Sequence, residues 1–161
     1  MIKVVIESPL AGDFEKNVRY ALWCAYHCYL RGESAFASHL FFPQFLDDRK
    51  PDAREYGIEA GYDWASDGDI FAFYLDLSWS VGMERAKQRW EGRKIEHRML
   101  PKELLAKFEA GEYPPGTLFH MAQEIVQLKD QLDLAAAQNY CTLCGETLDG
   151  YVPPEMKPER D

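Results

Sequence analysis

The most constraining feature of the sequence is residues 69–76, an apolar run with an aspartate at each end. The run reads Asp-Ile-Phe-Ala-Phe-Tyr-Leu-Asp. A strand that faces water on one side alternates apolar and polar residues, whereas a strand covered on both faces is apolar throughout. Residues 69–76 are therefore predicted to form a central strand of a parallel sheet that has helices on both faces.

The segments around this strand alternate between strand and helix patterns. Three more apolar runs predict strands at 2–7, 35–42 and 94–99. Helix patterns fill the intervals, at 14–31, 51–67 and 82–91. This alternation predicts an α/β fold with a doubly wound, Rossmann- or flavodoxin-like parallel sheet of four to five strands. Because ligands of such sheets bind beyond the carboxyl ends of the strands, the turns 8–13, 39–48 and 76–83 are expected to surround one crevice.

The first predicted helix, 14–31, has two faces of interest. One face is expected to pack on the sheet and carries Val18, Leu22, Ala25 and Tyr29. Cys24, His27 and Cys28 share another face at a spacing that metal ligands can use. The alternative is that these three residues belong to a buried apolar surface.

The C-terminal third of the chain differs in character from residues 1–100, which would form the α/β domain. Residues 101–116 contain adjacent prolines and two glycines and are predicted to be a linker. Residues 117–148 are predicted to be a helical extension with a C-x-x-C motif, and 149–161 a flexible tail rich in proline and charge.

Apolar residues in this extension alternate at spacings of three and four, the a/d pattern of a coiled coil. They are Leu118, Met121, Ile125, Leu128 and Leu132, with Ala135 in register. The helix is expected to pack on the α/β domain or on a second subunit. The second arrangement would give a homodimer or a higher homo-oligomer.

The charge balance argues against several kinds of partner. The chain has 18 basic and 27 acidic residues, a formal net charge of −9. Proteins that bind duplex nucleic acid carry a surplus of Lys and Arg on one face, and a negative field repels anionic membranes. We therefore expect neither duplex nucleic acid nor a membrane as partner. A small anionic ligand stays open, because a helix N-terminus and one or two arginines can hold a phosphate.

The sequence also indicates the cell compartment. Residues 1–6 run into a polar turn rather than into the apolar core of a signal peptide, and no apolar stretch reaches the length of a membrane span. Cysteines without a secretory signal are expected to be free thiols or metal ligands rather than disulfides. The predicted location is the cytoplasm.

Residues 78–84, Ser-Trp-Ser-Val-Gly-Met-Glu, form the predicted turn from the central strand into the next helix. Small residues there let backbone N–H groups approach a ligand, and the helix start adds the positive end of a dipole. Glu84 in the first helical turn would be held ionised and would point back into the crevice. Such a carboxylate can attack an anomeric carbon. The alternative is that Glu84 only complements the helix dipole at the surface.

Residues 80–84, Ser-Val-Gly-Met-Glu, resemble the nucleophile motif of the nucleoside 2-deoxyribosyltransferase superfamily, which includes the 2′-deoxynucleoside 5′-phosphate N-hydrolases. Residues 6–12 look like the first sugar- or phosphate-facing loop of that family. Residues 38–48 are similar to a compact branch common in bacteriophage genomes. The resemblance covers about residues 1–100. It implies cleavage or transfer at the N-glycosidic bond of a deoxynucleoside or its 5′-monophosphate.

The resemblance also implies roles for individual residues. Glu84 would attack C1′, and water or a second base would resolve the glycosyl-enzyme intermediate. The second acid of the family falls on Gly61 in this chain, so Asp63 or Glu59 is expected to replace it. Sugar or phosphate would contact residues of two loops, namely Ser8, Pro9, Gly12, Asp76, Ser78, Ser80, Gly82 and Met83. No cofactor is implied.

Polar residues near the end of the second predicted strand and in the loop after it complete the candidate set. His39 could orient a substrate or transfer a proton, or it could simply bond the Asp47–Asp48 loop. Asp48 is itself a candidate substrate ligand. Arg49 or Arg54 could hold a phosphate bidentately, with exposed ion pairing as the alternative.

Cys141 and Cys144 form a C-x-x-C motif with half the ligands that tetrahedral zinc needs. A second C-x-x-C is absent from the sequence, so a zinc site would need ligands from the first helix or from a second subunit. We expect no metal site here, with these two cysteines as the residual possibility.

A function of another class is open on the same residues. Many relatives in the compact branch carry their glutamate two positions further on, where this chain has Ala86, and Gly61 replaces the second acid. A pocket without these acids would bind a nucleotide and leave it intact, for example to sequester a host signalling nucleotide. A non-catalytic nucleotide-binding module of phage origin is therefore the alternative.

Overall fold

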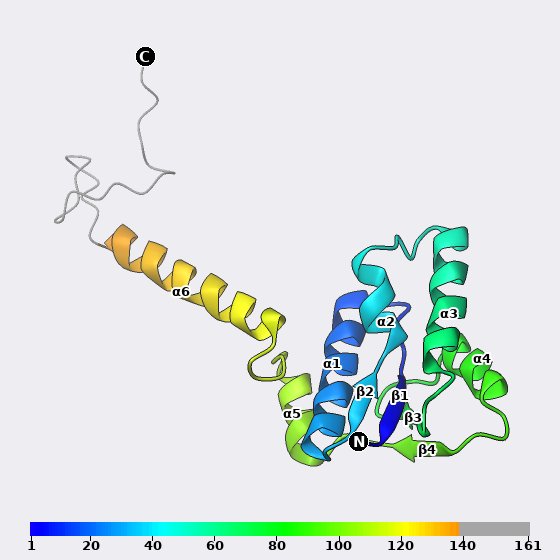
Figure 1. Ribbon diagram of the computed structural model, residues 1–161. Helices are drawn as coiled ribbons and strands as arrows, with labels where there is room; N and C mark the ends of the chain where they lie inside the picture. Colours follow the sequence, from blue (N-terminus) through cyan, green and yellow to red (C-terminus); the bar gives the residue numbers. More distant parts are fainter. Residues whose placement is uncertain (139–161) are drawn as a thin grey trace. The chain divides into compact units, whose positions relative to one another are not determined.

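The computed structural model describes residues 1–138 of the chain (Figure 1). It divides at Pro114 into two compact units. The strands of the first unit are β1 (Lys3–Glu7), β2 (Ser34–Phe36), β3 (Ile70–Tyr74) and β4 (Ile95–Arg98). Its helices are α1 (Phe14–Leu30), α2 (Ser38–Phe41), the 3-10 helix η1 (Phe42–Gln44), α3 (Pro51–Ala65), α4 (Val81–Arg89) and α5 (Lys102–Glu109). The second unit contributes α6 (Leu118–Gln138).

The four strands form one sheet in the order β2-β1-β3-β4, and every neighbouring pair is parallel. The chain moves outward from β1 to β2 and then returns to build β3 and β4 on the other side of β1. The direction of winding therefore reverses between β1 and β3, which is where doubly wound sheets bind ligands. The predicted α/β class and doubly wound parallel sheet are confirmed, with four strands in the described part of the chain.

Helices cover both faces of the sheet, α1 and α5 on one and α3 and α4 on the other (Figure 1). The first core contains Val4, Ile6, Tyr20, Trp23, Ala72, Tyr74 and Phe108. The second contains Val5, Ala65, Phe71, Phe73, Met83, Ala86 and Trp90. Successive residues of β3 enter opposite cores, so all five are buried. This explains why the run 69–76 has no polar residue in its middle.

The second strand is shorter than the predicted 35–42. β2 ends at Phe36, and the following residues form α2. The reason is the packing of α2 on α3: a Cβ placed on Gly61 would lie only 2.7 Å from the Ser38 Cβ atom. Phe42 is also buried in this contact, 7% exposed. Packing against α3 thus makes residues 38–42 helical, although their apolar composition indicated a strand.

The buried face of α1 lies to one side of the predicted face. Its buried residues are Asn17, Tyr20, Ala21, Trp23, Cys24 and Cys28. Of the predicted residues, Tyr29 is 69% exposed, and the other three are half-buried. Because α1 packs against both the sheet and α5, large rings and thiols occupy its centre and the predicted aliphatic residues lie at its margin.

The segment 101–116, predicted to be a linker, contains a helix. α5 packs on α1 through Phe108, which is 3% exposed and whose ring centroid lies 5.2 Å from that of Tyr20. The Trp23 indole Nε1 donates a hydrogen bond to the Glu112 carbonyl oxygen at 2.8 Å. The first compact unit therefore extends to Pro114 rather than ending near residue 100.

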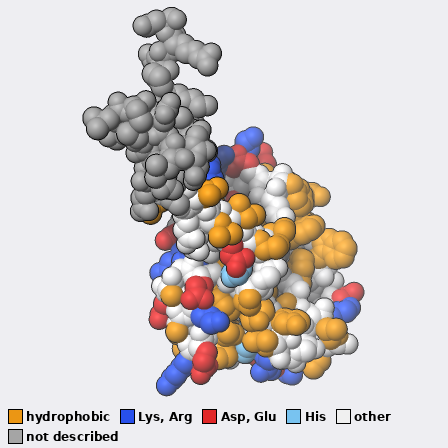
Figure 2. All heavy atoms as spheres, turned by 90° about the vertical axis from the view of Figure 1, so that its left-hand side faces the viewer, with side chains coloured by type: hydrophobic (Ala, Val, Ile, Leu, Met, Phe, Trp, Pro, Cys, Tyr) orange, Lys and Arg blue, Asp and Glu red, His pale blue; other side chains and the backbone are white. Residues whose placement is uncertain are grey.

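The surface of the first unit also carries exposed apolar side chains, several of which are visible on the face drawn in Figure 2. Phe41 and Phe45, beside η1, are 49% and 62% exposed. Among residues 1–138, none of the helices has the length and apolar character needed to cross a membrane. The C-x-x-C motif at Cys141 and Cys144 and the predicted tail 149–161 lie outside the described residues.

Candidate functional site

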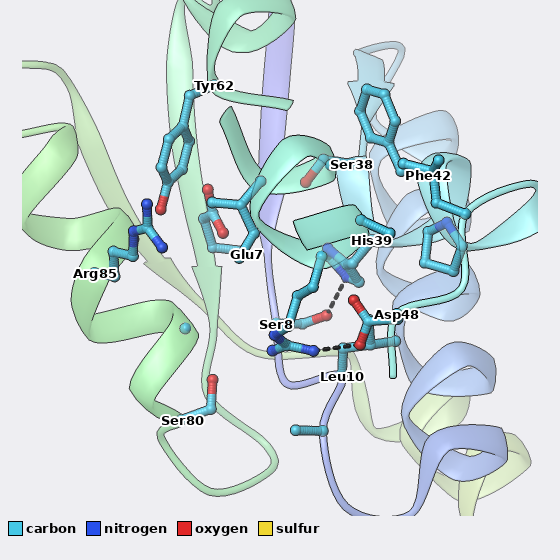
Figure 3. A pocket seen from close by; sticks show the side chains of 18 residues that line it. Glu7, Ser8, Leu10, Ser38, His39, Phe42, Asp48, Tyr62, Ser80 and Arg85 are labelled. Carbon is cyan, nitrogen blue, oxygen red and sulfur yellow. Dashed lines mark hydrogen bonds and ion pairs between the residues drawn. The ribbon is translucent and has the colours of Figure 1, made fainter. Parts of the chain in front are cut away.

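A pocket opens at the carboxyl ends of β1 and β3, where the winding of the sheet reverses. Four segments line it: the end of β1 with the loop that follows it, α2 with the loop that follows it, one face of α3, and the start of α4. In Figure 3, Tyr62, Glu7 and Arg85 lie on one side of the pocket, and His39, Phe42 and Asp48 lie on the other. The loops predicted to surround one crevice thus meet here, joined by α3.

Glu7 is the carboxylate nearest the sheet and the last residue of β1. Its Oε1 accepts a hydrogen bond from the Trp90 Nε1 at 3.1 Å. Burial raises the pKa of the Glu7 carboxyl to about 7, and the bond from Trp90 only partly offsets this. At neutral pH this carboxyl is therefore divided between a proton-donating and a proton-accepting form.

Ser8 and His39 meet across the pocket. The Ser8 Oγ and the His39 Nε2 lie 2.8 Å apart, within hydrogen-bond distance. Burial lowers the pKa of His39 to about 4, so the imidazole is neutral at physiological pH. A base with so low a pKa is poorly matched to proton abstraction at neutral pH. The pair is better suited to presenting polar atoms to a ligand than to activating the serine, and Ser8 takes the place of the predicted Asp47–Asp48 partner.

Two arginines stand at the rim of the pocket, each already paired with acids. Arg54 on α3 pairs with Asp48, and both side chains are about a third exposed. Arg85 on α4 donates to Glu55 at 2.7 Å and to Glu59 at 2.7 Å. Exposed ion pairs of this kind contribute little to stability, so an anionic ligand can displace the carboxylates at small cost.

The start of α4 forms one wall of the pocket. Ser80 is its N-cap residue, and the Ser80 Oγ accepts a hydrogen bond from the Met83 backbone N–H at 3.2 Å. Ser80 and Gly82 line the pocket. A Cβ added to Gly82 would lie 3.7 Å from the Ser80 Oγ, which is an ordinary van der Waals contact. Met83 instead enters the core and is 1% exposed.

Glu84, the predicted nucleophile, is exposed and does not line the pocket. Its Oε2 accepts from the Trp79 Nε1 at 3.1 Å, and its Oε1 accepts from the Gln88 Nε2 at 3.3 Å. The helical repeat explains this position. Gly82 and Arg85, three residues apart, face the pocket, so Glu84 is turned away by a rotation of about 100° from Arg85.

Three further predicted residues, Asp63, Asp76 and Ser78, are not brought into the pocket. Asp76 lies beside α1, where its Oδ2 accepts from the Tyr20 hydroxyl at 2.6 Å and from the Leu100 N–H at 3.0 Å. Asp63, the predicted second acid, is exposed on α3, and Ser78 is exposed in the turn after β3.

Pro9 and Gly12 shape the loop after β1 rather than the pocket wall. Pro9 is buried, and Gly12 adopts a φ of 96° that favours glycine. The Asn17 side-chain amide donates to the carbonyl oxygens of Leu10 and Ala11 at 3.1 and 2.8 Å. This bracing holds the loop over the pocket, which Leu10 and Ala11 line.

The possible metal ligands of α1 belong to the core instead. Cys24 and Cys28 are buried free thiols whose pKa values are raised by burial. The His27 Nδ1 lies 3.1 Å from the Tyr74 hydroxyl. Within residues 1–138 no group of three His, Cys, Asp or Glu side chains could hold a metal ion.

Three lining residues, Glu7, Tyr62 and Arg85, were not predicted individually from the sequence. One signal was available for Glu7, because a charged residue at the end of a buried strand stands at the edge where ligands bind. Nothing in the sequence indicated that Trp90 would cover it. The predicted residues that do line the pocket are Ser8, His39, Asp48, Arg54, Ser80 and Gly82.

The sheet order and the two-sided helix cover define the protein as a doubly wound α/β protein with a pocket at its switch point. The chain belongs to the family described as Domain of unknown function (DUF7768), whose model matches residues 2–100. The matched residues include all four strands and the whole pocket, while α5 and α6 lie beyond them. No curated protein and no solved structure matches the chain.

Proposed function

We propose that this pocket binds a nucleoside or a nucleoside 5′-monophosphate. The observation that carries the proposal is the joining of the loops after β1 and β3 in one pocket that the buried Glu7 carboxyl also lines. Because that carboxyl is near half-protonated at neutral pH, it can both donate and accept a hydrogen bond. Sugar hydroxyl pairs and base edges present matching donors and acceptors.

The rest of the pocket suits the other parts of such a ligand. Phe42 and Tyr62 supply aromatic surface for a base. Arg54 and Arg85 supply guanidinium groups that can exchange carboxylate partners for a phosphate. The N-terminus of α4 adds free backbone N–H groups and a favourable dipole on the same wall.

Cleavage of the N-glycosidic bond is the second candidate, and Glu7 is the residue that favours it. A carboxyl with a pKa near 7 is well suited to give a proton to a leaving base at neutral pH. Asp48 is the other carboxylate of the pocket. A pair of acids in one pocket is the minimum that glycosidic hydrolysis requires. Under this candidate Glu7, rather than Glu84, is the acid that matters.

Titration calorimetry with a panel of nucleosides and their 5′-monophosphates tests the binding proposal. We expect Arg54→Gln to lower the affinity for monophosphates by roughly tenfold and the affinity for the matching nucleosides much less. The control is Arg49→Gln, because Arg49 is 90% exposed and pairs with Asp47 outside this pocket. Binding of no member of the panel, or equal losses in the two variants, would contradict the proposal.

Release of free base from the same panel separates the two candidates. Under cleavage, Glu7→Gln abolishes release and Glu84→Gln leaves it unchanged. Under binding alone, the ligand is recovered intact after the protein is denatured. Loss of release only in Glu84→Gln would restore the exposed glutamate as nucleophile and overturn the role given to Glu7.

We keep the cytoplasm as the proposed location of the protein. Nucleotides are abundant there, and buried free thiols such as those of Cys24 and Cys28 persist there.

A further inference from the structure

Helix α6 carries a continuous row of exposed apolar side chains. The row follows the a/d spacing predicted from the sequence, and each member is substantially exposed in a single chain. The exposed fractions are 79% for Leu118, 42% for Met121, 66% for Ile125, 64% for Leu128 and 70% for Leu132. Five apolar side chains in one row exceed the scattered exposure that is normal on a monomer. This row, Leu118 to Leu132, is called the α6 seam below.

The heptad register of the seam follows from its spacing. Leu118, Ile125 and Leu132 fall at a positions, and Met121 and Leu128 fall at d positions. A β-branched residue at an a position followed by leucine at the d position, as at Ile125 and Leu128, favours a parallel coiled coil of two helices. The seam therefore has the chemistry of one half of a two-stranded coiled coil.

The charges beside the seam fit a second copy of the same helix. Glu124 falls at a g position and Lys129 at the e position of the next heptad. In a parallel, in-register pair each g residue faces the following e residue of the other helix, so Glu124 of each copy meets Lys129 of the other. Glu124 is 59% exposed and lies 3.5 Å from His120 Nδ1 on its own helix, so its carboxylate is available at the flank of the seam.

The opposite alignment leaves these charges unpaired. In an antiparallel pair g faces g and e faces e, so Glu124 would face Gln131 and Lys129 would face Ala122. We propose that α6 pairs with α6 of a second copy of this chain in a parallel, in-register coiled coil, held by the α6 seam and by two symmetric Glu124–Lys129 ion pairs. This partner is independent of the ligand proposed for the pocket.

Light scattering on the full chain tests the pairing. At high protein concentration we expect the mass of two chains. The dissociation constant of the dimer should be roughly 5 to 500 μM, because a seam of two heptads is short. Ile125→Glu is expected to give a monomer at every loading. The matched control is Gln127→Glu, which adds the same charge to α6 away from the seam and should stay dimeric. A monomeric wild type, or equal behaviour of the two variants, would overturn the proposal.

Charge exchange tests the parallel alignment. Glu124→Lys alone and Lys129→Glu alone each place like charges opposite one another twice, and each should raise the dissociation constant by roughly tenfold. An equimolar mixture of the two single variants should recover the wild-type mass, because every facing pair is then of opposite sign. The double variant should recover it as well. A dimer that is indifferent to all these changes would rule out the parallel alignment, and circular dichroism checks that each variant keeps its fold.

Discussion

Glu7 lines the pocket, and the burial of its carboxyl lowers the stability of the folded state at neutral pH. Its carboxyl has a pKa near 4.5 in an unfolded chain and about 7 in the fold, so the folded state holds its proton longer. The folded state is therefore destabilised as pH rises from about 4.5 to about 7, and the effect is constant above that range. The shift corresponds to at most about 3 kcal/mol.

Glu7→Gln removes this titration. We expect the variant to gain stability over the wild type as pH rises from about 4 to about 8, by up to about 3 kcal/mol, because glutamine keeps the bond from Trp90 without a charge. Urea denaturation of both proteins across this range measures the difference. A difference that does not change with pH would show that burial does not raise the pKa of this carboxyl.

The place of Glu7 in the pocket depends on contacts between residues far apart in the sequence. Burial raises the pKa of Glu7, and the bond from Trp90, which lies 83 positions away in the sequence, partly lowers it. The prediction for Glu84 was limited in a different way. Its place in the first turn of a helix was correctly inferred, but the phase of α4 about its axis decides which of Glu84 and Arg85 meets the pocket. Burial of Met83 and Ala86 sets that phase, and the sequence motif alone does not reveal it.

Among the elements, α4 depends on its cap. Ser80→Ala removes the hydroxyl that accepts from the Met83 N–H and is expected to cost about 1 kcal/mol of stability. The control is Ser78→Ala, in the exposed turn before the helix, which should stay within about 0.5 kcal/mol of the wild type. Thermal or urea denaturation measures both. Equal effects would mean that the hydroxyl of Ser80 does not cap the helix in solution.

β4 is tied to the residue that precedes β2 by a buried ion pair. The Arg98 guanidinium donates to both Glu33 oxygens, at 2.7 and 3.0 Å, and the two side chains are 7% and 6% exposed. Arg98→Met leaves the buried carboxylate with Arg31 as its remaining partner and should cost about 3–5 kcal/mol.

A double-mutant cycle measures the coupling between these two residues. The double variant Glu33→Gln, Arg98→Met lacks both buried charges. Its loss of stability should therefore be smaller than the sum of the losses in the two single variants. Urea denaturation of the four proteins gives the coupling energy. Strictly additive losses would contradict a direct interaction between the two side chains.

The sequence predicted elements best where burial dictates composition on its own. β3 was predicted correctly because a strand covered on both faces must be apolar, and its neighbours followed from the alternation of patterns. The segment 35–42 was assigned wrongly because an apolar run can be buried as a strand or as a helical turn. Contact with α3 made that choice, and no local pattern encodes it.

The whole first unit is larger than the family match suggests. The match ends at residue 100, yet Phe108 and Tyr113 are 3% and 7% exposed, and the Trp23 indole bonds to the carbonyl of Glu112. A fragment of residues 1–116 should unfold cooperatively with the stability of this unit in the full chain. A fragment of residues 1–100 should lose at least about 4 kcal/mol, because it uncovers the α1 core and leaves the indole N–H without its acceptor.

Circular dichroism during thermal unfolding compares the two fragments. Equal stability would mean that α5 and the turn after it add nothing to the core. A fragment of residues 1–116 that is less stable than the first unit of the full chain would contradict the boundary at Pro114.

The tight fit of α2 against Gly61 restricts how this protein could change its chemistry. Any side chain at this position must displace the backbone that carries His39, since even a methyl group would lie 2.7 Å from the Ser38 Cβ. A single codon change that installs an acid there would disturb the mouth of the pocket before it could contribute to a reaction. Descendants of this chain that acquire an acid in place of Gly61 would therefore be expected to carry a compensating change in α2.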